Sequence, residues 1–189
     1  MLSSLKSPYQ SGISANVAYG FGYDTIIEKY KVVVIFIKAS GNKAKIKVHD
    51  LGTNSWRMVQ DDVLVHGTLT FVKDTLHWFE DIDYNIVFFN FVNDSYQKFT
   101  HPNYGLEIEA SVNLSVLRDF LCILARRHDF CDVWQMKHYG NEESWSKLCR
   151  VHFPSLVSLT KAIWISTDDQ VMLVYVALLR MNVAIFRYQ

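Results

Sequence analysis

Short apolar runs separated by polar turns recur along the whole chain. Three segments share one pattern: an apolar strand, a turn rich in Asn, Asp, Gly or Glu, and then serine followed by an aromatic residue. They are residues 46–59, 86–99 and 131–151. The aromatic residues are Trp56, Tyr96 and Trp145, which are 40 and 49 residues apart. A period in that range predicts a stacked or radial repeat of small antiparallel sheets.

Strands are also predicted between and beyond the three segments. The clearest is Tyr30–Ile37, a β-branched run without helix-favouring residues. Val116–Ala125 predicts two strands around an Arg118-Asp119 turn, and residues 126–129 predict a polar hairpin tip. The last block predicts strands at 162–166, 171–176 and 183–186.

Helix is a weak alternative in only two places, residues 157–163 and 171–180, and neither has a convincing cap or stop. Strands of about five residues at intervals of 8–12 residues are typical of an all-β propeller, sandwich or barrel. The long repeat favours the propeller. Residues 1–16 are small and polar and predict a flexible tail. The domain is then expected to span residues 17–189.

Composition narrows the partners and the compartment. The 189 residues carry 19 basic and 19 acidic side chains, so the net charge of zero gives no indication of a nucleic-acid or membrane partner. Three cysteines are too few for a disulfide framework and favour a reducing compartment. The first residues lack the apolar core of a signal peptide, and the apolar run Val171–Leu179 is too short to span a membrane. A cytoplasmic or nuclear protein is expected.

Each candidate for chemistry has a simpler structural interpretation. No G-x-S-x-G turn is present, and Gly20-x-Gly22 lacks the third glycine of a dinucleotide loop, so close strand packing is preferred there. One set resembles metal ligands (Cys122, His128, Cys131 and Cys149), but it lacks paired ligands at both ends. Glu80, Asp81 and Asp83 lack the register of a calcium loop and predict a solvated loop.

The histidines and tryptophans are interpreted as structural. His49, His66 and His77 lie at predicted strand ends or hairpins, where satisfied hydrogen bonds explain them. The tryptophans are most simply sheet-packing residues, whereas an aromatic side chain exposed on a loop would be an interface anchor. They are Trp56, Trp78, Trp134, Trp145 and Trp164. We therefore expect no catalytic residue, no cofactor and no metal.

In combination and in order, several motifs of this chain resemble the F-box-associated domain of plant F-box proteins, which include F-box/kelch-like and S-locus F-box proteins. They span most of residues 17–165. The matching positions are Gly20, Phe21, Gly22, Tyr23, Asp24, Tyr30, Lys31, Trp56, Leu76, His77, Trp78, Trp134, Met136, Tyr139, Gly140 and Trp145. The segments Thr53–Arg57 and Val65–Leu69 also fit the resemblance.

The resemblance implies a kelch-like β-propeller that follows an N-terminal F-box. In such proteins the F-box docks on a Skp-type adaptor of a cullin–RING ubiquitin ligase, and the associated domain captures the protein to be ubiquitinated. This chain departs from the pattern, since residues 1–16 are too short for an F-box and Phe71–Asp74 looks inserted. From the resemblance we also expect that early blades, which the family usually forms upstream of this motif, are not part of this chain. Adaptor binding is therefore not expected here, and the repeat length predicts a partial propeller of about four blades.

The leading hypothesis is a non-catalytic substrate-recognition module that binds a target protein through loops at one face. One alternative is a decoy or structural fragment that binds targets without recruiting the ligase; adaptor binding would distinguish it. A β-propeller enzyme is a second alternative. It would require a convergent carboxylate or metal cluster, and substitution of His128 or Cys131 would then abolish activity.

Overall fold

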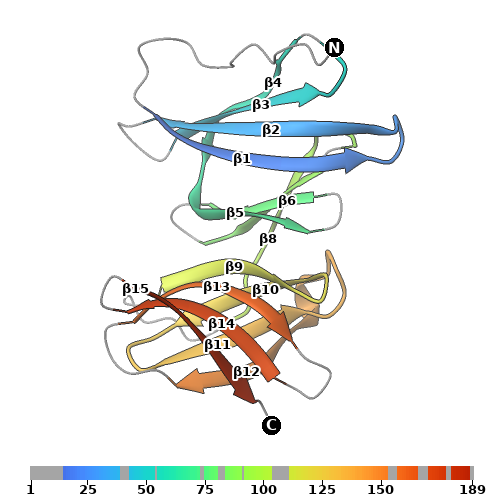
Figure 1. Ribbon diagram of the computed structural model, residues 1–189. Coiled ribbons are helices and arrows are strands. Elements are labelled where there is room, and N and C mark those ends of the chain that lie inside the picture. The colour runs from blue at the N-terminus through green and yellow to red at the C-terminus, as the bar shows by residue number, and fades with distance from the viewer. Residues whose placement is uncertain are drawn as a thin grey trace. The chain divides into compact units, whose positions relative to one another are not determined.

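A computed structural model shows a chain built almost entirely of antiparallel β-strands (Figure 1). The structure describes residues 15–38, 43–53, 55–72, 75–80, 84–90, 92–103, 111–152, 157–165, 170–177 and 180–187. The chain forms two compact units, residues 1–98 and 99–189. Among the described residues no helix is long and apolar enough to cross a membrane.

The first unit contains two four-stranded sheets with strands in chain order. The first sheet consists of β1 (Ala15–Asp24), β2 (Lys29–Lys38), β3 (Lys43–Asp50) and β4 (Arg57–Leu64). The second consists of β5 (His66–Val72), β6 (Thr75–Phe79), β7 (Ile86–Asn90) and β8 (Tyr96–Phe99). Each is a simple antiparallel meander, which short turns between consecutive strands produce.

Among the described residues, the second unit contains a four-stranded and a three-stranded sheet, again with strands in chain order. The third sheet consists of β9 (Ser111–Leu117), β10 (Phe120–Arg126), β11 (Phe130–Met136) and β12 (Trp145–His152), with a single 3₁₀ turn, η1 (Glu142–Ser144), before β12. The fourth consists of β13 (Val157–Ile165), β14 (Gln170–Ala177) and β15 (Arg180–Arg187). The described residues of the two stretches for which helix was an alternative, 157–163 and 171–180, therefore lie in strands.

The repeat seen in the sequence has a structural meaning. In each four-stranded sheet it forms the third and fourth strands, β3–β4, β7–β8 and β11–β12. Tyr96 and Trp145 begin the fourth strand of their sheets, and Trp56 immediately precedes β4. The all-β prediction and the expectation of about four blade-like sheets are confirmed.

The turn predicted at Arg118-Asp119 is also present between β9 and β10. Both residues have positive φ angles, 48° and 62°. Two consecutive left-handed residues match the right-handed twist of the flanking strands in a two-residue hairpin, and aspartate tolerates this conformation better than most residues. At the other predicted tip, Arg127 N–H donates to the Phe130 carbonyl at 2.7 Å and closes the β10–β11 hairpin.

The core of the first unit lies between its two sheets. Val33, Ile35, Ile46 and Val48 of the first sheet pack with a second set from the second sheet, namely Leu76, Trp78, Val87 and Phe89. β1 approaches this core closely, because a Cβ atom on Gly20 would lie 3.1 Å from both Leu76 Cδ atoms. Glycine at position 20 therefore permits the sheets to meet, as expected from the packing interpretation.

Two predicted features fall mostly outside the described residues. The tail expected over residues 1–16 is described only at its last two positions, which begin β1. Of the segment Phe71–Asp74, the first two residues pair with Leu76 and Thr75 at the end of the β5–β6 hairpin. Lys73 and Asp74 themselves are not described.

Candidate protein-interaction site

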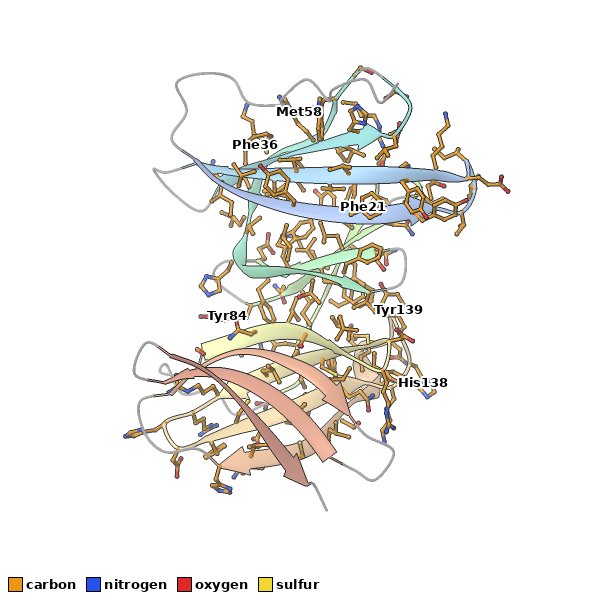
Figure 2. All side chains as sticks on the ribbon, viewed as in Figure 1. Phe21, Phe36, Met58, Tyr84, His138 and Tyr139 are labelled. Atoms are coloured by element: carbon orange, nitrogen blue, oxygen red, sulfur yellow. The ribbon has the colours of Figure 1, made fainter. Side chains whose placement is uncertain are left out.

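The β1 motif alternates between two faces of the first sheet. Gly20, Gly22 and Asp24 point to the buried side. Phe21 and Tyr23 point to the opposite side, where 53% and 36% of their surfaces are exposed. Successive side chains of a strand face opposite sides, so this motif combines small residues at the core with aromatic residues in solvent. Figure 2 shows Phe21 on β1.

Asp24 organises the β1–β2 turn. Its Oδ1 atom accepts hydrogen bonds from the backbone N–H groups of Ile26, at 2.9 Å, and Ile27, at 3.2 Å. Glu28 then takes a left-handed conformation with φ of 50° and returns the chain into β2. The turn holds Ile26 and Ile27 outward, with 74% and 47% of their surfaces exposed. A carboxylate that satisfies two turn N–H groups fixes the turn without help from its hydrophobic residues.

The exposed residues of β1, β2 and this turn form one apolar surface. Tyr30 stacks on Phe21 with ring centroids 5.1 Å apart and meets Tyr23 edge-on at 4.9 Å. Leu51, which is 37% exposed, donates its N–H to the Tyr30 carbonyl at 2.8 Å and so adjoins this group. We call the set the turn surface: Phe21, Tyr23, Ile26, Ile27, Tyr30 and Leu51.

An ion network links three turns of the first unit on the buried side of β1. Lys31 and Asp24 are 3% and 1% exposed, and their Nζ and Oδ2 atoms lie 2.6 Å apart. Asp50 and Asp94 each lie 4.0 Å from the same Nζ atom. Arg57 forms a two-point ion pair with Asp94, in which Nη2 donates to Oδ1 at 2.8 Å, and its Nη2 lies 3.8 Å from Asp50.

These five side chains join the β1–β2 turn, the β3–β4 loop and the β7–β8 turn at one end of the first unit. Buried charges persist only when they are paired, so the positions of the three connections depend on one another. Burial by itself would raise the pKa of Asp24, but hydrogen bonds from Lys31, Ile27 and Ile26 outweigh it and keep the pKa below its usual value. Asp24 is therefore ionised near neutral pH.

The sequence motif included Asp24, Lys31 and Arg57, but Asp50 and Asp94 were not recognised as their partners. Both aspartates lie at the turns of the repeat, at the end of β3 and between β7 and β8. They do not occupy equivalent positions of the repeat, since Asp50 lies six residues before Trp56 and Asp94 two residues before Tyr96. Only the fold shows that these two turns meet at the same pair of cations.

Most other motif residues of the first unit are structural. Trp56 meets buried His49 edge-on at 5.0 Å. Leu76 and Trp78 are core residues, and Trp78 Nε1 donates to the Leu64 carbonyl at 3.1 Å. His77 is fully buried, with Nδ1 3.1 Å from the Thr70 carbonyl, and burial lowers its pKa to about 4. It is thus a neutral histidine satisfied by backbone, as predicted from the sequence.

In the second unit the motif residues build a tightly bonded loop between β11 and β12. Met136 Sδ accepts the N–H of Gly140 at 3.2 Å, and Gly140 has a φ of 79°. Asn141 Oδ1 accepts the N–H of Glu143 at 3.0 Å. Ser144 Oγ accepts from the N–H of His138 at 3.0 Å. The loop thereby holds its exposed residues in fixed positions, and Figure 2 shows His138 and Tyr139 on it.

Neighbouring contacts fix the same loop to the rest of the second unit. Glu142 Oε2 accepts from the N–H and Oγ1 of Thr100, at 2.7 and 2.5 Å. These hydrogen bonds lower the pKa of Glu142. Trp134 and Trp145 are half-buried at the facing ends of β11 and β12. The loop is a second rigid display element, although it carries fewer exposed apolar residues than the turn surface.

The four candidate metal ligands differ in burial. Cys122, Cys131 and Cys149 are buried free thiols, and burial raises the pKa of Cys122 and Cys149 to about 12. His128 is exposed at the β10–β11 hairpin tip. Within the described ranges, no group of three or more His, Cys, Asp or Glu side chains is placed to hold a metal. Of the acidic loop residues, Glu80 pairs with Lys98 at 2.6 Å, whereas Asp81 and Asp83 lie outside the described residues.

Comparisons with known proteins agree with this architecture. Several Arabidopsis thaliana proteins are similar: F-box protein At4g22390 is 28% identical over 169 residues, which cover 75% of this chain and 42% of that protein. F-box/kelch-repeat protein At3g23880 is 27% identical over 173 residues, 83% of this chain and 45% of that protein. F-box protein CPR1 is 26% identical over 186 residues, with coverages of 82% and 45%. The chain thus spans less than half the length of these relatives.

A solved structure from a study titled "Structural and Mechanistic Analysis of Two Prolyl Endopeptidases: Role of Inter-Domain Dynamics in Catalysis and Specificity" is similar in fold. Its TM-score is 0.53 at 12% identity, and the match covers 90% of this chain and 26% of that chain. A likeness at this identity concerns the fold alone. The family profile described as "F-box associated beta propeller domain" matches residues 5–185. The chain therefore belongs to the family of F-box associated β-propeller domains.

Proposed function

We propose that this chain is a non-catalytic recognition module that captures a target protein for ubiquitination by an F-box-type, cullin–RING ubiquitin ligase. Family membership and the F-box relatives support a role in protein interaction. The observation that carries the proposal is the turn surface. Its apolar side chains are exposed on a support that is itself rigid.

The composition of the turn surface suits a protein partner. Three aromatic and three aliphatic side chains lie together, each at least 36% exposed. Continuous exposed apolar groups are characteristic of interaction sites, and aromatic residues dominate the centres of interfaces. Exposed Glu28 and Lys29 lie beside them and supply a polar rim. The partner that fits is a protein surface with an apolar centre.

The contacts beneath the turn surface also favour binding. The Asp24 carboxylate and the ion network hold the turn before a partner arrives, so less conformational entropy is lost on association. An equivalent surface on a mobile loop would bind more weakly. This use of turns on a β-sheet support agrees with the recognition role expected from the family.

The proposal assigns no catalysis to this domain. The described groups with large pKa shifts, such as His77 and Cys122, owe those shifts to burial in apolar surroundings. A catalytic group is instead expected beside a substrate cleft with charged partners.

Within this proposal, contact with a Skp-type adaptor belongs to the F-box of a full-length family protein and not to this domain. The module would act in the cytoplasm or the nucleus, where buried free thiols such as those of Cys122 and Cys149 remain reduced.

A chimera tests the proposal. Residues 1–189 replace the matching region of the F-box/kelch-repeat protein At3g23880, and proteins bound and ubiquitinated by the complex are identified by quantitative mass spectrometry. Ile26→Asp with Ile27→Asp should remove at least one protein from both sets, and binding of that protein should then be reproduced with purified components. The matched control is Phe120→Asp, which alters an exposed apolar residue in the second unit. The proposal is wrong if no protein depends on Ile26 and Ile27, or if the control removes the same proteins.

A further inference from the structure

A second surface, on β11 and β12, carries a different chemistry. The strand register places Phe130 opposite His152, Asp132 opposite Arg150 and Trp134 opposite Lys147. Lys147 and Arg150 are three positions apart and would face opposite sides of a regular strand. The irregularity between Val133 and Trp134, which leaves Leu148 without a partner in the register, brings both cations to the side of Asp132.

Asp132 holds both cations in place. Arg150 Nε and Nη2 donate to its two carboxylate oxygens at 2.7 and 2.8 Å, and Lys147 Nζ lies 3.0 Å from Oδ2. The Asp132 side chain is 5% exposed, whereas those of Arg150 and Lys147 are 43% and 40% exposed. Burial would raise the pKa of Asp132, but the two cations keep it below its usual value. The carboxylate therefore lies beneath a layer of positive charge.

Aromatic rings support the same cations. The Arg150 guanidinium carbon lies 3.8 Å from the centroid of the Phe130 ring, and that of Arg127 lies 5.7 Å from it. Lys147 Nζ lies 5.5 Å from the Trp134 centroid. Stacking on a ring and pairing with a carboxylate both restrict a long side chain. We call Arg127, Lys147 and Arg150, with Asp132 and the two rings beneath them, the basic face.

Two observations bear on what the basic face is for. β12 is the outer strand of its sheet, and edge strands are often protected by lysines that extend into solvent. Here the cations are instead drawn together over one carboxylate. Asp129, in the hairpin tip, also interacts electrostatically with Arg150 and is the second acidic group beside these cations. The three cations still exceed the two carboxylates, and Lys147 and Arg150 are exposed over Asp132.

We propose that the basic face binds an acidic segment of a partner protein, through carboxylate or phosphate groups placed over Lys147 and Arg150. Preorganised Arg and Lys side chains recognise such groups by charge-assisted hydrogen bonds. The inference rests on the proposed recognition role and adds the chemistry of a second contact on the target. The turn surface would bind an apolar region, and the basic face an acidic one.

The test uses the full 189-residue chain and three short fluorescent peptides of one sequence that carry glutamate, phosphoserine or glutamine at the same alternating positions. Fluorescence anisotropy should show binding of the glutamate or the phosphoserine peptide, weakened by added salt. Phosphoserine binding alone would identify phosphate as the source of the anion, and glutamate binding would identify carboxylate. Equal binding of the glutamine peptide, or no binding of either acidic peptide at low salt, would overturn the proposal.

Matched variants locate the contact. Lys147→Gln removes one cation and leaves the Asp132–Arg150 pair that stabilises the fold, and it should weaken acidic-peptide binding by about tenfold. Lys137→Gln makes the same change in charge at an exposed lysine on the loop after β11 and should have little effect. Equal losses in the two variants would contradict the assignment. Ile26→Asp leaves this assay unchanged, so failure of the basic face and failure of the turn surface are separable.

Discussion

The buried pair of Asp24 and Lys31 offers the sharpest test of the support beneath the turn surface. Replacing Lys31 with methionine keeps much of the side chain's volume but removes its charge. Asp24, 1% exposed, then loses the ammonium at 2.6 Å while its two N–H donors remain. Removing one partner of a buried ion pair costs about 3–5 kcal/mol, because an uncompensated charge stays behind.

The chain contains a matched control for this change. Lys98 and Glu80 have the same separation of 2.6 Å, but their side chains are 49% and 21% exposed. An exposed pair contributes at most about 1 kcal/mol. Lys98→Met should therefore lower the free energy of unfolding by at most about a third of the loss caused by Lys31→Met. The free energy of unfolding is measured in urea, with near-ultraviolet circular dichroism of the tryptophans as the signal.

The pH dependence gives an independent check. In the natural chain the pKa of Asp24 is lowered on folding, so its contribution is present above the unfolded pKa of about 3.8 and is lost as pH falls through the lower folded value. Without Lys31, the pKa of Asp24 in the folded chain rises above its value in the natural chain, because burial still raises it and both contributions of Lys31 that lower it are lost. The difference in free energy of unfolding between the natural chain and Lys31→Met should then shrink as pH falls, since Asp24 becomes protonated at a higher pH in the variant. Equal losses in Lys31→Met and Lys98→Met, or a deficit independent of pH, would refute this reasoning.

Three further predictions concern individual side chains. The pKa of His77 is about 4 in the folded chain against 6.5 when unfolded, so His77 should not titrate by NMR near neutral pH, and a titration of the native chain near 6.5 would contradict this. The free energy of unfolding should fall by roughly 3 kcal/mol as pH drops from 6.5 to about 4, and a His77→Gln variant should lack that fall. Cys122, whose pKa burial raises to about 12, should react with iodoacetamide only after unfolding, as peptide mapping would show; rapid modification of the folded chain would refute its burial. Gly140→Ala should cost about 1 kcal/mol in urea unfolding, because φ is 79° although no atom lies within 4 Å of the new Cβ; an unchanged midpoint would contradict this strain.

The strand pattern was largely predictable because it depends on local sequence. The run Tyr30–Ile37 became β2, and the repeat near Trp145 became β11 and β12. Arg118-Asp119 was recognised as a turn without glycine, and its two positive φ angles show why a polar pair suffices. In these places the residues and the fold require the same conformation.

The last block was ambiguous because its apolar residues do not alternate clearly with polar ones. Residues 157–163 and 171–180 satisfy a helix pattern as well as a buried strand. Pairing decides the matter, since β14 lies between β13 and β15 and hydrogen-bonds to both. The two irregularities in the β13–β14 register also disturb any simple period of two.

The candidate site was predictable as a motif but not as a surface. The alternation of glycine and aromatic residues from Gly20 to Tyr23 suggested close packing, and Gly20 does meet Leu76. The exposure of Phe21 and the pairing of Asp94 with Arg57 depend on contacts between segments far apart in the chain. Periodicity describes one strand at a time and therefore cannot supply them.

The three copies of the repeat are alike in their strands but differ in the contacts that fix their turns. The strand pairs β3–β4, β7–β8 and β11–β12 have one arrangement, yet each turn is fixed by other means. Asp50 and Asp94 join an ion network with Lys31 and Arg57, whereas in the third turn Ser144 Oγ and Asn141 Oδ1 accept hydrogen bonds from backbone N–H groups. Because the core between the two sheets of the first unit uses strand residues, with Val65 of the β4–β5 connection, and none from the turns of the repeat, these turns can change their side chains without loss of that core. In a repeat built in this way the strands stay constant while the turn side chains vary, and under the proposed recognition role a change in the turns would change which target is bound without a change in the sheets.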